Sequence, residues 1–184
     1  MILASHNSLT YNKPQWYLRP LAWIGRCQNK TIQEQYELGV RYFDIRIKYD
    51  DYTAISGHGL LTYNINVLEV IKTIANFNEG CVVRVTLENT KKYHIDRGKF
   101  IADCYYWEQM FPDVTFEGGC QKGTWDLLYD FERKERIHIE EHYWLFNRES
   151  KFPLIKFFAK MRNTLLKDAF TTRSGYLMLD FVEL

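Results

Sequence analysis

Short runs of apolar and β-branched residues alternate along this chain with segments in which apolar residues recur at helical spacing. The strand-like runs are short and bounded by Gly, Asp or Asn, and Cys81–Leu87 is the clearest of them. Strands are predicted at Met1–Ser5, Val40–Lys48, Tyr52–Ile55, Cys81–Leu87, Val114–Glu117, Arg136–Trp144 and Tyr176–Val182. Helices are predicted at Thr31–Leu38, Val67–Phe77, Gly98–Phe111 and Phe152–Leu166, and residues 7–30 are expected to form a loop.

The alternation of strands and helices indicates βα units and a mainly parallel sheet of about six strands. A complete eight-fold barrel takes roughly 200 residues or more, whereas this chain has 184. We therefore expect an α/β fold, a small, distorted or incomplete TIM-type (β/α) barrel. The chain shows no internal repeat or linker, so residues 1–184 are interpreted as a single catalytic domain.

Composition narrows the class of protein. Apolar residues make up 46% of the chain, enough for a packed core, and the net charge is only +1 with dispersed cations, which disfavours nucleic acid as a partner. The sequence shows no signal peptide and no apolar run of about 20 residues, so a soluble protein is expected. Its four cysteines form no CxxC pair and are expected to be reduced thiols. The cellular location and the oligomeric state are not indicated.

Polar residues stand at the ends of nearly every predicted strand. Because the active site of a parallel barrel lies at the C-terminal ends of its strands, these residues should converge, which predicts an enzyme. Asp44 and Arg46 are two positions apart on one strand and so share a face. The other members of this set are His6, Asn7, His58, Glu88, Glu141, Tyr143 and Asp180.

These residue types favour phosphoryl chemistry. One histidine can take a proton from a nucleophile while a second gives one to a leaving group. The planar fork of Arg46 suits a phosphate. A carboxylate such as Asp180 can fix the tautomer of a histidine and stabilise its cation.

Five segments then match a known family. They resemble, in the family's order, the catalytic X domain of phosphatidylinositol-specific phospholipase C, which folds as a distorted (β/α) barrel. The segments are ASHNSLTY (4–11), GVRYFDIRI (39–47), SGHG (56–59), VTLEN (85–89) and LMLDF (177–181). Bacterial members cleave phosphatidylinositol to diacylglycerol and inositol 1,2-cyclic phosphate. The resemblance implies the same phosphodiesterase or phosphorus–oxygen lyase reaction here.

Roles follow from the same resemblance. His6 would be the general base for the inositol 2-hydroxyl, and His58 the general acid for the diacylglycerol oxygen. Arg46 would stabilise charge on the phosphate, with Asp44 as its supporting carboxylate. Asp180 would orient His6. Glu141 and Tyr143 resemble the pair that holds the inositol ring, and Asn7 and Glu88 are assigned to substrate binding as well.

Two departures bear on cofactors and substrate. Eukaryotic members hold a calcium ion through an asparagine and three acids. Asn7, Asp44 and Glu88 match three of these positions and would be the calcium ligands, but Arg46 stands at the fourth. Its positive charge repels a cation, so we expect no metal cofactor. Bacterial members often have aspartate in place of Asn7 and lysine in place of Glu88, which leaves the headgroup open.

Alternatives remain open from sequence alone. The substrate could instead be another lipid or soluble glycerophosphodiester, or the domain could be an inert module that binds a phospho-ligand or a protein. The HxxEH pattern from His138 to His142 matches a zinc-protease motif, but the segment alternates as a strand and the motif needs a helix. The aromatic-rich group Trp16, Tyr17, Leu21 and Trp23 could contact a membrane surface transiently or pack over the open side of the barrel.

Overall fold

A computed structural model describes residues 2–88, 93–119, 127–130, 135–138, 155–169 and 176–184. Its strands are β1 (Ile2–Ser5), β2 (Val40–Asp50), β3 (Thr53–His58), β4 (Leu61–Asn66), β5 (Cys81–Leu87), β6 (Val114–Gly119), β7 (Leu127–Asp130), β8 (Glu135–His138) and β9 (Tyr176–Leu179). Its helices are η1, a 3₁₀ helix (Trp16–Leu21), α1 (Ala22–Gly25), α2 (Ile32–Glu37), α3 (Val67–Ala75), α4 (Tyr93–Met110) and α6 (Ile155–Ala169).

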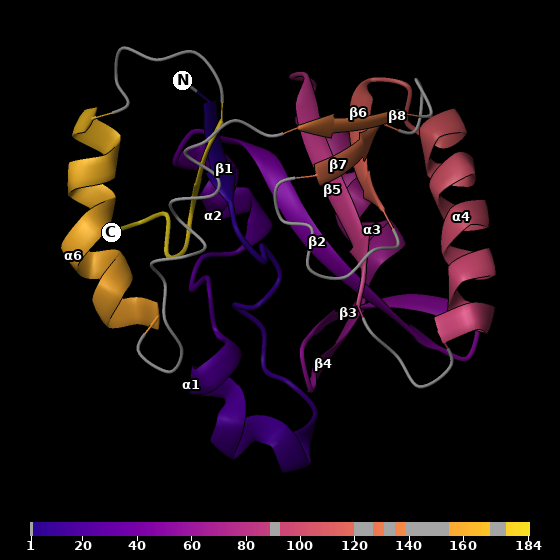
Figure 1. Ribbon diagram of the computed structural model, residues 1–184, viewed down its shortest axis with the longest axis horizontal. Coiled ribbons are helices and arrows are strands. Elements are labelled where there is room, and N and C mark those ends of the chain that lie inside the picture. The colour runs from indigo at the N-terminus through magenta and orange to yellow at the C-terminus, as the bar shows by residue number, and fades with distance from the viewer. Residues whose placement is uncertain (1, 89–92, 120–126, 131–134, 139–154, 170–175) are drawn as a thin grey trace.

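The strands form one curled sheet whose centre is parallel (Figure 1). The parallel part has the order β9-β1-β2-β5-β6, which puts the first and last described strands side by side. Antiparallel strands extend it, β3 and β4 from β2, and β7 and β8 from β6. This arrangement is an incomplete TIM-type barrel and confirms the predicted fold class.

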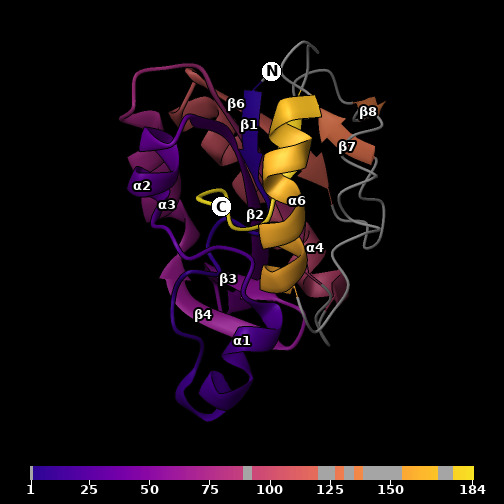
Figure 2. The ribbon, with the colours of Figure 1, turned by 90° about the vertical axis from the view of Figure 1, so that its left-hand side faces the viewer.

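Side chains alternate between the two faces of the central strands. On β2 and β5 the residues that point outward are apolar and pack, with α2, α3 and α4, into the main core; Figure 2 shows α2 and α3 covering one side of the sheet. The residues that point inward include Tyr42, Asp44, Arg46, Arg84 and Glu88. The outer face therefore holds the fold together, and the inner face carries the charged groups.

Several element boundaries differ from those predicted. Residues 7–30 contain η1 and α1, and neither β4 nor β7 was predicted, because short segments become strands only through a partner that periodicity does not reveal. His58 is the last residue of β3 rather than following it. α4 begins at Tyr93, ahead of the predicted start at Gly98, since a helix tolerates an internal glycine at modest cost. Beyond His138, the strand predicted to Trp144 lies outside the described residues.

None of the helices that the structure describes combines the length and the apolar character needed to cross a bilayer.

Candidate active site

The two histidines lie near each other because β1 and β3 both pair with the same edge of β2. The opposite edge of β2 pairs with β5 from Tyr42 to Ile47. β1 pairs with the first part of β2, and β3 pairs antiparallel with its last four residues. The gap between them lies at Asp44–Arg46, where β1 continues into His6 and β3 ends at His58. The two imidazole rings consequently lie with centroids 6.5 Å apart.

His6 is held by Asp180 from the last strand. β1 and β9 are parallel neighbours in which Ser5 pairs with Leu179, so the next residue of each strand emerges at the same place. The His6 Nδ1 atom lies 2.7 Å from Asp180 Oδ1, and both side chains are buried. With the Nδ1 proton donated to this carboxylate, Nε2 of the neutral imidazole carries a lone pair. This geometry suits a general base.

Asn7 connects both histidines to the carboxylate of Asp44. Its backbone has a left-handed φ of +46°, an uncommon conformation for a non-glycine residue, and its N–H donates to Asp44 Oδ2 at 3.0 Å. Its Nδ2 lies 3.2 Å from His6 Nε2 and 3.3 Å from His58 Nε2. A half-turn of the amide would present its oxygen to a protonated His58. Asn7 therefore suits either protonation state of that histidine.

His58 is positioned by the last residue of α1. Its Nδ1 donates to the Gly25 carbonyl at 2.9 Å. A Cβ on Gly25 would lie 2.6 Å from a terminal Leu61 side-chain carbon and 3.3 Å from His58 Nδ1, so a larger residue there would push the Leu61 side chain aside and crowd His58. Burial lowers the pKa of His58 below its usual 6.5, the charge of Arg46 lowers it further, and the bond to Gly25 opposes both.

Arg46 bridges two buried carboxylates. Its Nε donates to Asp44 Oδ2 at 3.3 Å and its Nη1 to Glu88 Oε1 at 3.2 Å. A second cation, Arg84, approaches Asp44 Oδ1 at 3.7 Å. Burial alone would raise the pKa of Asp44, but the charges of the two arginines outweigh it and lower that pKa to about 2. Asp44 is therefore ionised, and its charge is opposed by two arginines.

Some residues of this inner face were not anticipated from sequence. Arg84 reaches Asp44, and deeper in the barrel the Tyr42 hydroxyl donates to Glu117 Oε2 at 3.1 Å. Arg84 was detectable, because it is the one charged residue in the otherwise uncharged run CVVRVTL and is four positions from Glu88. Glu117 likewise sits two residues before Gly119 at the end of a predicted strand.

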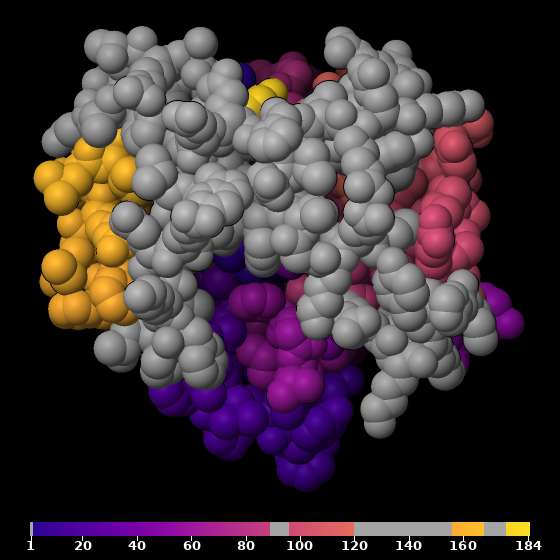
Figure 3. Space-filling view, in the orientation of Figure 1, coloured from indigo at the N-terminus to yellow at the C-terminus, as the bar shows by residue number. Residues whose placement is uncertain are grey.

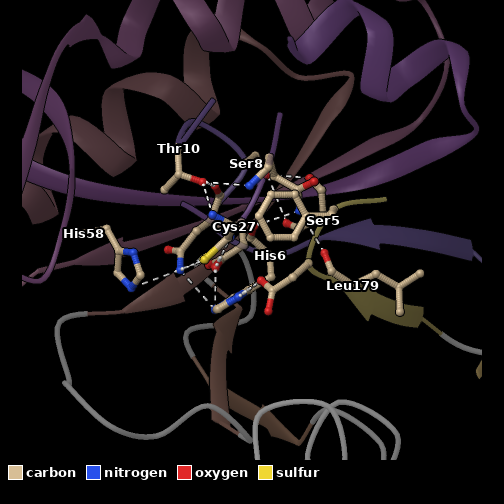
Figure 4. Close-up of polar contacts among 12 residues, drawn as sticks. Ser5, His6, Ser8, Thr10, Cys27, His58 and Leu179 are labelled. Carbon is tan, nitrogen blue, oxygen red and sulfur yellow. Dashed lines mark hydrogen bonds and ion pairs between the residues drawn. The ribbon is translucent and has the colours of Figure 1, made fainter. Parts of the chain in front are cut away.

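Two further unanticipated residues lie in the segment after α1. Thr10 Oγ1 accepts the backbone N–H groups of Cys27 and Gln28 at 2.9 and 3.0 Å. The Gln28 amide then donates to the carbonyls of His6 and Leu179, at 3.0 and 2.8 Å, and so joins the ends of β1 and β9. This course brings the Cys27 sulfur beside His6, as Figure 4 shows. Burial, and next the charge of Asp180, raise the pKa of the Cys27 thiol. No sequence pattern marked either residue.

Most of the predicted site residues lie together at one end of the parallel strands. Glu141 and Tyr143 lie outside the described residues, so their proposed contact with the ring stays a prediction. His138 lies in β8, whereas the zinc-protease motif needs a helix; His142 lies outside the described residues. Cys27, Cys81 and Cys104 are free thiols. The residues that converge are His6, Asn7, Asp44, Arg46, His58, Glu88 and Asp180.

The aromatic-rich group of η1 and α1 is exposed rather than packed over the barrel. Trp16 is 77% exposed and Trp23 is 59% exposed, and Tyr17 and Leu21 are exposed as well. The alternative that these residues pack over the open side of the barrel is therefore wrong. Figures 1 and 3 show that this indigo segment forms one end of the molecule. It adjoins the candidate site, because the last residue of α1, Gly25, holds His58.

Comparison with solved structures relates this fold to one group of enzymes. A variant of the phosphatidylinositol-specific phospholipase C from Staphylococcus aureus superposes with a TM-score of 0.65 at 13% identity, over 98% of this chain and 84% of the other. The enzyme from Listeria monocytogenes gives 0.61 at 15% identity, over 98% and 87%. A Staphylococcus aureus structure from a study of membrane binding gives 0.66 at 13%, over 98% and 85%. No protein-family model and no curated protein sequence matches the chain. At these identities the likeness shows the fold.

Proposed function

We propose that this chain is a phosphodiesterase that cleaves phosphatidylinositol to diacylglycerol and inositol 1,2-cyclic phosphate. The observation that carries the proposal is the pair of histidines on either side of Asn7, with His6 bonded to Asp180 and His58 within the electrostatic influence of Arg46. The fold shared with the bacterial phospholipases supports it. The sequence resemblance assigns the same residues to the same reaction.

The chemistry follows from the proton positions. Nε2 of His6 accepts the proton of the inositol 2-hydroxyl, and that oxygen attacks phosphorus. The bond from phosphorus to the diacylglycerol oxygen breaks, and a protonated His58 donates its Nε2 proton to that oxygen. Asp180 stabilises the imidazolium that forms on His6. Arg46 supplies positive charge to the phosphate in the transition state.

No metal ion takes part in this proposal. A calcium ion would use oxygen atoms of Asn7, Asp44 and Glu88. The Arg46 guanidinium donates to both of those carboxylates, at 3.3 and 3.2 Å, and occupies the space between them with a positive charge. The residues present therefore do not fit a calcium ion, and Arg46 does the ion's electrostatic work.

A different glycerophosphodiester is the second candidate substrate. Glu88 is 6% exposed and its carboxylate lies beside Arg46, so it places negative charge within the site. A carboxylate accepts hydrogen bonds from hydroxyl groups but repels an additional phosphate on the headgroup. An unphosphorylated polyol or glycerol headgroup fits this environment, so a glycerophosphodiester with a glycerol headgroup is compatible with it as well as phosphatidylinositol.

The exposed aromatic residues of η1 and α1 are proposed to contact the lipid surface transiently. Trp and Tyr favour the interface between water and hydrocarbon, and this segment adjoins the site through the contact of Gly25 with His58. The contact would bring the phosphodiester of a membrane lipid to the histidines.

Phosphorus NMR of phosphatidylinositol vesicles tests the reaction. Wild-type protein should produce the signal of a cyclic phosphodiester. His6→Ala and His58→Ala should each lower the rate about 10²–10⁴-fold, the usual contribution of a general acid or base. Tyr52→Ala is the matched control, because this residue is 86% exposed on the turn between β2 and β3 and should leave the rate unchanged.

Other outcomes would redirect the proposal. A linear phosphomonoester as the first product would mean that water attacks instead of the 2-hydroxyl. Turnover of glycerophosphoinositol alone would favour the soluble substrate. No turnover of any glycerophosphodiester would contradict the enzymatic function and favour a binding module.

A further inference from the structure

A buried cysteine completes a group of three different ligand types beside the candidate base. One ligand atom each from His6, Cys27 and Asp180 lies within 4.8 Å of the other two. The three residues come from separate segments: the end of β1, the loop after α1 and the end of β9. They are 7%, 0% and 1% exposed. Their convergence is set by the Thr10 and Gln28 hydrogen bonds that fix the loop, not by sequence proximity.

The carboxylate of Asp180 offers a ligand atom to this cluster. Its Oδ1 lies 2.7 Å from His6 Nδ1, whereas its buried Oδ2 forms no hydrogen bond within the described residues. Asn7 Nδ2 donates to the Cys27 sulfur at 3.5 Å. A buried acceptor normally has a partner, and a cation beside the thiol would provide one for Oδ2.

We propose that His6, Cys27 and Asp180 bind a thiophilic divalent cation such as Zn²⁺, and that this ion switches the catalytic base off. A set of imidazole nitrogen, thiolate sulfur and carboxylate oxygen, with a fourth position open, matches what Zn²⁺ accepts in proteins. Calcium prefers oxygen ligands, so the ion that fits here differs from the one that the family resemblance would suggest. The inhibition of the base rests on the proposed function, whereas the binding of the ion does not.

The bound ion inactivates the general base whichever ring nitrogen of His6 it takes. If the ion takes Nε2 of His6, the atom that would accept the substrate proton is occupied. If it takes Nδ1, it displaces the hydrogen bond to Asp180, and the ring proton moves to Nε2, which then cannot accept another. The Cys27 thiol loses one proton to solvent as the metal–sulfur bond forms. The bound ion also neutralises the unpaired carboxylate oxygen of Asp180.

Cobalt(II) titration of the metal-free protein tests the binding directly, without reference to activity. One equivalent of Co²⁺ should produce a thiolate-to-cobalt charge-transfer band in the near ultraviolet, and Zn²⁺ should displace it. Cys27→Ser should abolish the band. Cys104→Ser is the matched control, because Cys104 is equally buried but lies in the outer core, and it should retain the band.

A missing band in the wild type, or a band that survives in Cys27→Ser, would overturn the proposed site. Thermal unfolding monitors whether Cys27→Ser folds, and Cys27→Ala provides a second variant without the ligand if it does not. Zinc binding measured by competition with a chromophoric chelator should fall about tenfold or more in either variant, since even outer partners of a metal site contribute that much.

An activity measurement then separates this inference from the proposed function. Zinc should inhibit phosphatidylinositol cleavage by the wild type, and a chelator should reverse the inhibition. Relative to its own rate without metal, Cys27→Ser should need about tenfold or more zinc for half-inhibition than the wild type does. Cobalt binding without lipid turnover would leave the metal site standing and refute the phosphodiesterase. Turnover without cobalt binding, or equal zinc inhibition in Cys27→Ser, would refute the metal site.

Discussion

The outer and inner faces of β2 and β5 are built from alternate residues of the same strands, yet they share almost no chemistry. The outer face contributes side chains such as Ile45 and Val85 to the main core, where they are fully buried against the helices. The inner face carries Asp44, Arg46 and Arg84, which are also buried. Burial is therefore common to both faces, and what differs is whether the buried group is apolar or charged.

Stability therefore depends mainly on the apolar outer face, and the chemistry depends on the charged inner face. Apolar burial contributes to stability without demanding a partner, whereas each buried charge must be paired. On the inner face the pairing is extensive, from Asp44 through Arg46 to Glu88. Neighbouring residues on one strand should thus respond differently to substitution, one through stability and the other through catalysis.

Ile45→Ala tests the outer face and should have the largest effect on stability. Truncating a fully buried isoleucine leaves a cavity and costs about 2–5 kcal/mol in the free energy of unfolding. Urea denaturation measures that free energy. The turnover number per folded molecule should stay within about twofold of wild type, and a tenfold loss would show that the two faces are not separable.

Arg46→Lys, one residue further along the strand, tests the inner face. The charge that opposes Asp44 and Glu88 is retained, so the free energy of unfolding should change less than it does in Ile45→Ala. The planar fork is lost, and kcat/KM should fall roughly 10–100-fold because a lysine contacts a phosphate as a point charge. Initial rates and urea denaturation of the same preparation provide both numbers. Unchanged kcat/KM would remove Arg46 from the site.

The pH profile of activity extends this comparison to a titratable group, because burial shifts the pH at which such a group becomes charged. As a general acid, His58 must be protonated, so activity is lost as pH rises through its pKa. Burial and Arg46 lower that pKa, so the alkaline limb of kcat/KM should lie below pH 6.5. His58→Gln should lack this limb. An alkaline limb above pH 6.5 in the wild type would contradict the assignment of this role to His58.

Trp16→Ala tests a third kind of surface, apolar but unburied, and should have the smallest effect. Losing partial burial of one tryptophan in lipid costs about 1 kcal/mol, or roughly a fivefold weaker partition onto vesicles. Vesicle sedimentation measures the partition, with Tyr52→Ala as the control on another exposed turn. Equal weakening by both substitutions, or none by Trp16→Ala, would argue against a specific lipid contact.

The sequence predicted the parts of this fold that local patterns determine. The alternation in β2 and β5, and the motifs around His6, His58 and Asp180, are read from neighbouring residues. The short strands β4 and β7 were missed because their pairing partners, not their own residues, make them strands. The exposure of Trp16 and Trp23 was undecided, since an aromatic cluster suits a core and a lipid surface equally well.

The candidate site was predictable only where a residue belongs to a motif. Cys27 and Gln28 lie in an irregular segment whose course depends on hydrogen bonds to Thr10 and to the ends of two strands. No periodicity describes such a path. Arg84 was within reach, because a charge inside a buried strand requires a partner, and Asp44 on the adjacent strand was already identified.

Arg46 is proposed to take the place of a cation on the inner face, and two histidines to do the proton transfers. The initial rate of phosphatidylinositol cleavage by the wild type, in excess chelator and again in excess calcium, tests this proposal. The rate should be the same in both conditions, with a cyclic phosphate as the product. A rate that collapses in chelator and is restored by calcium would make Asn7, Asp44 and Glu88 metal ligands instead.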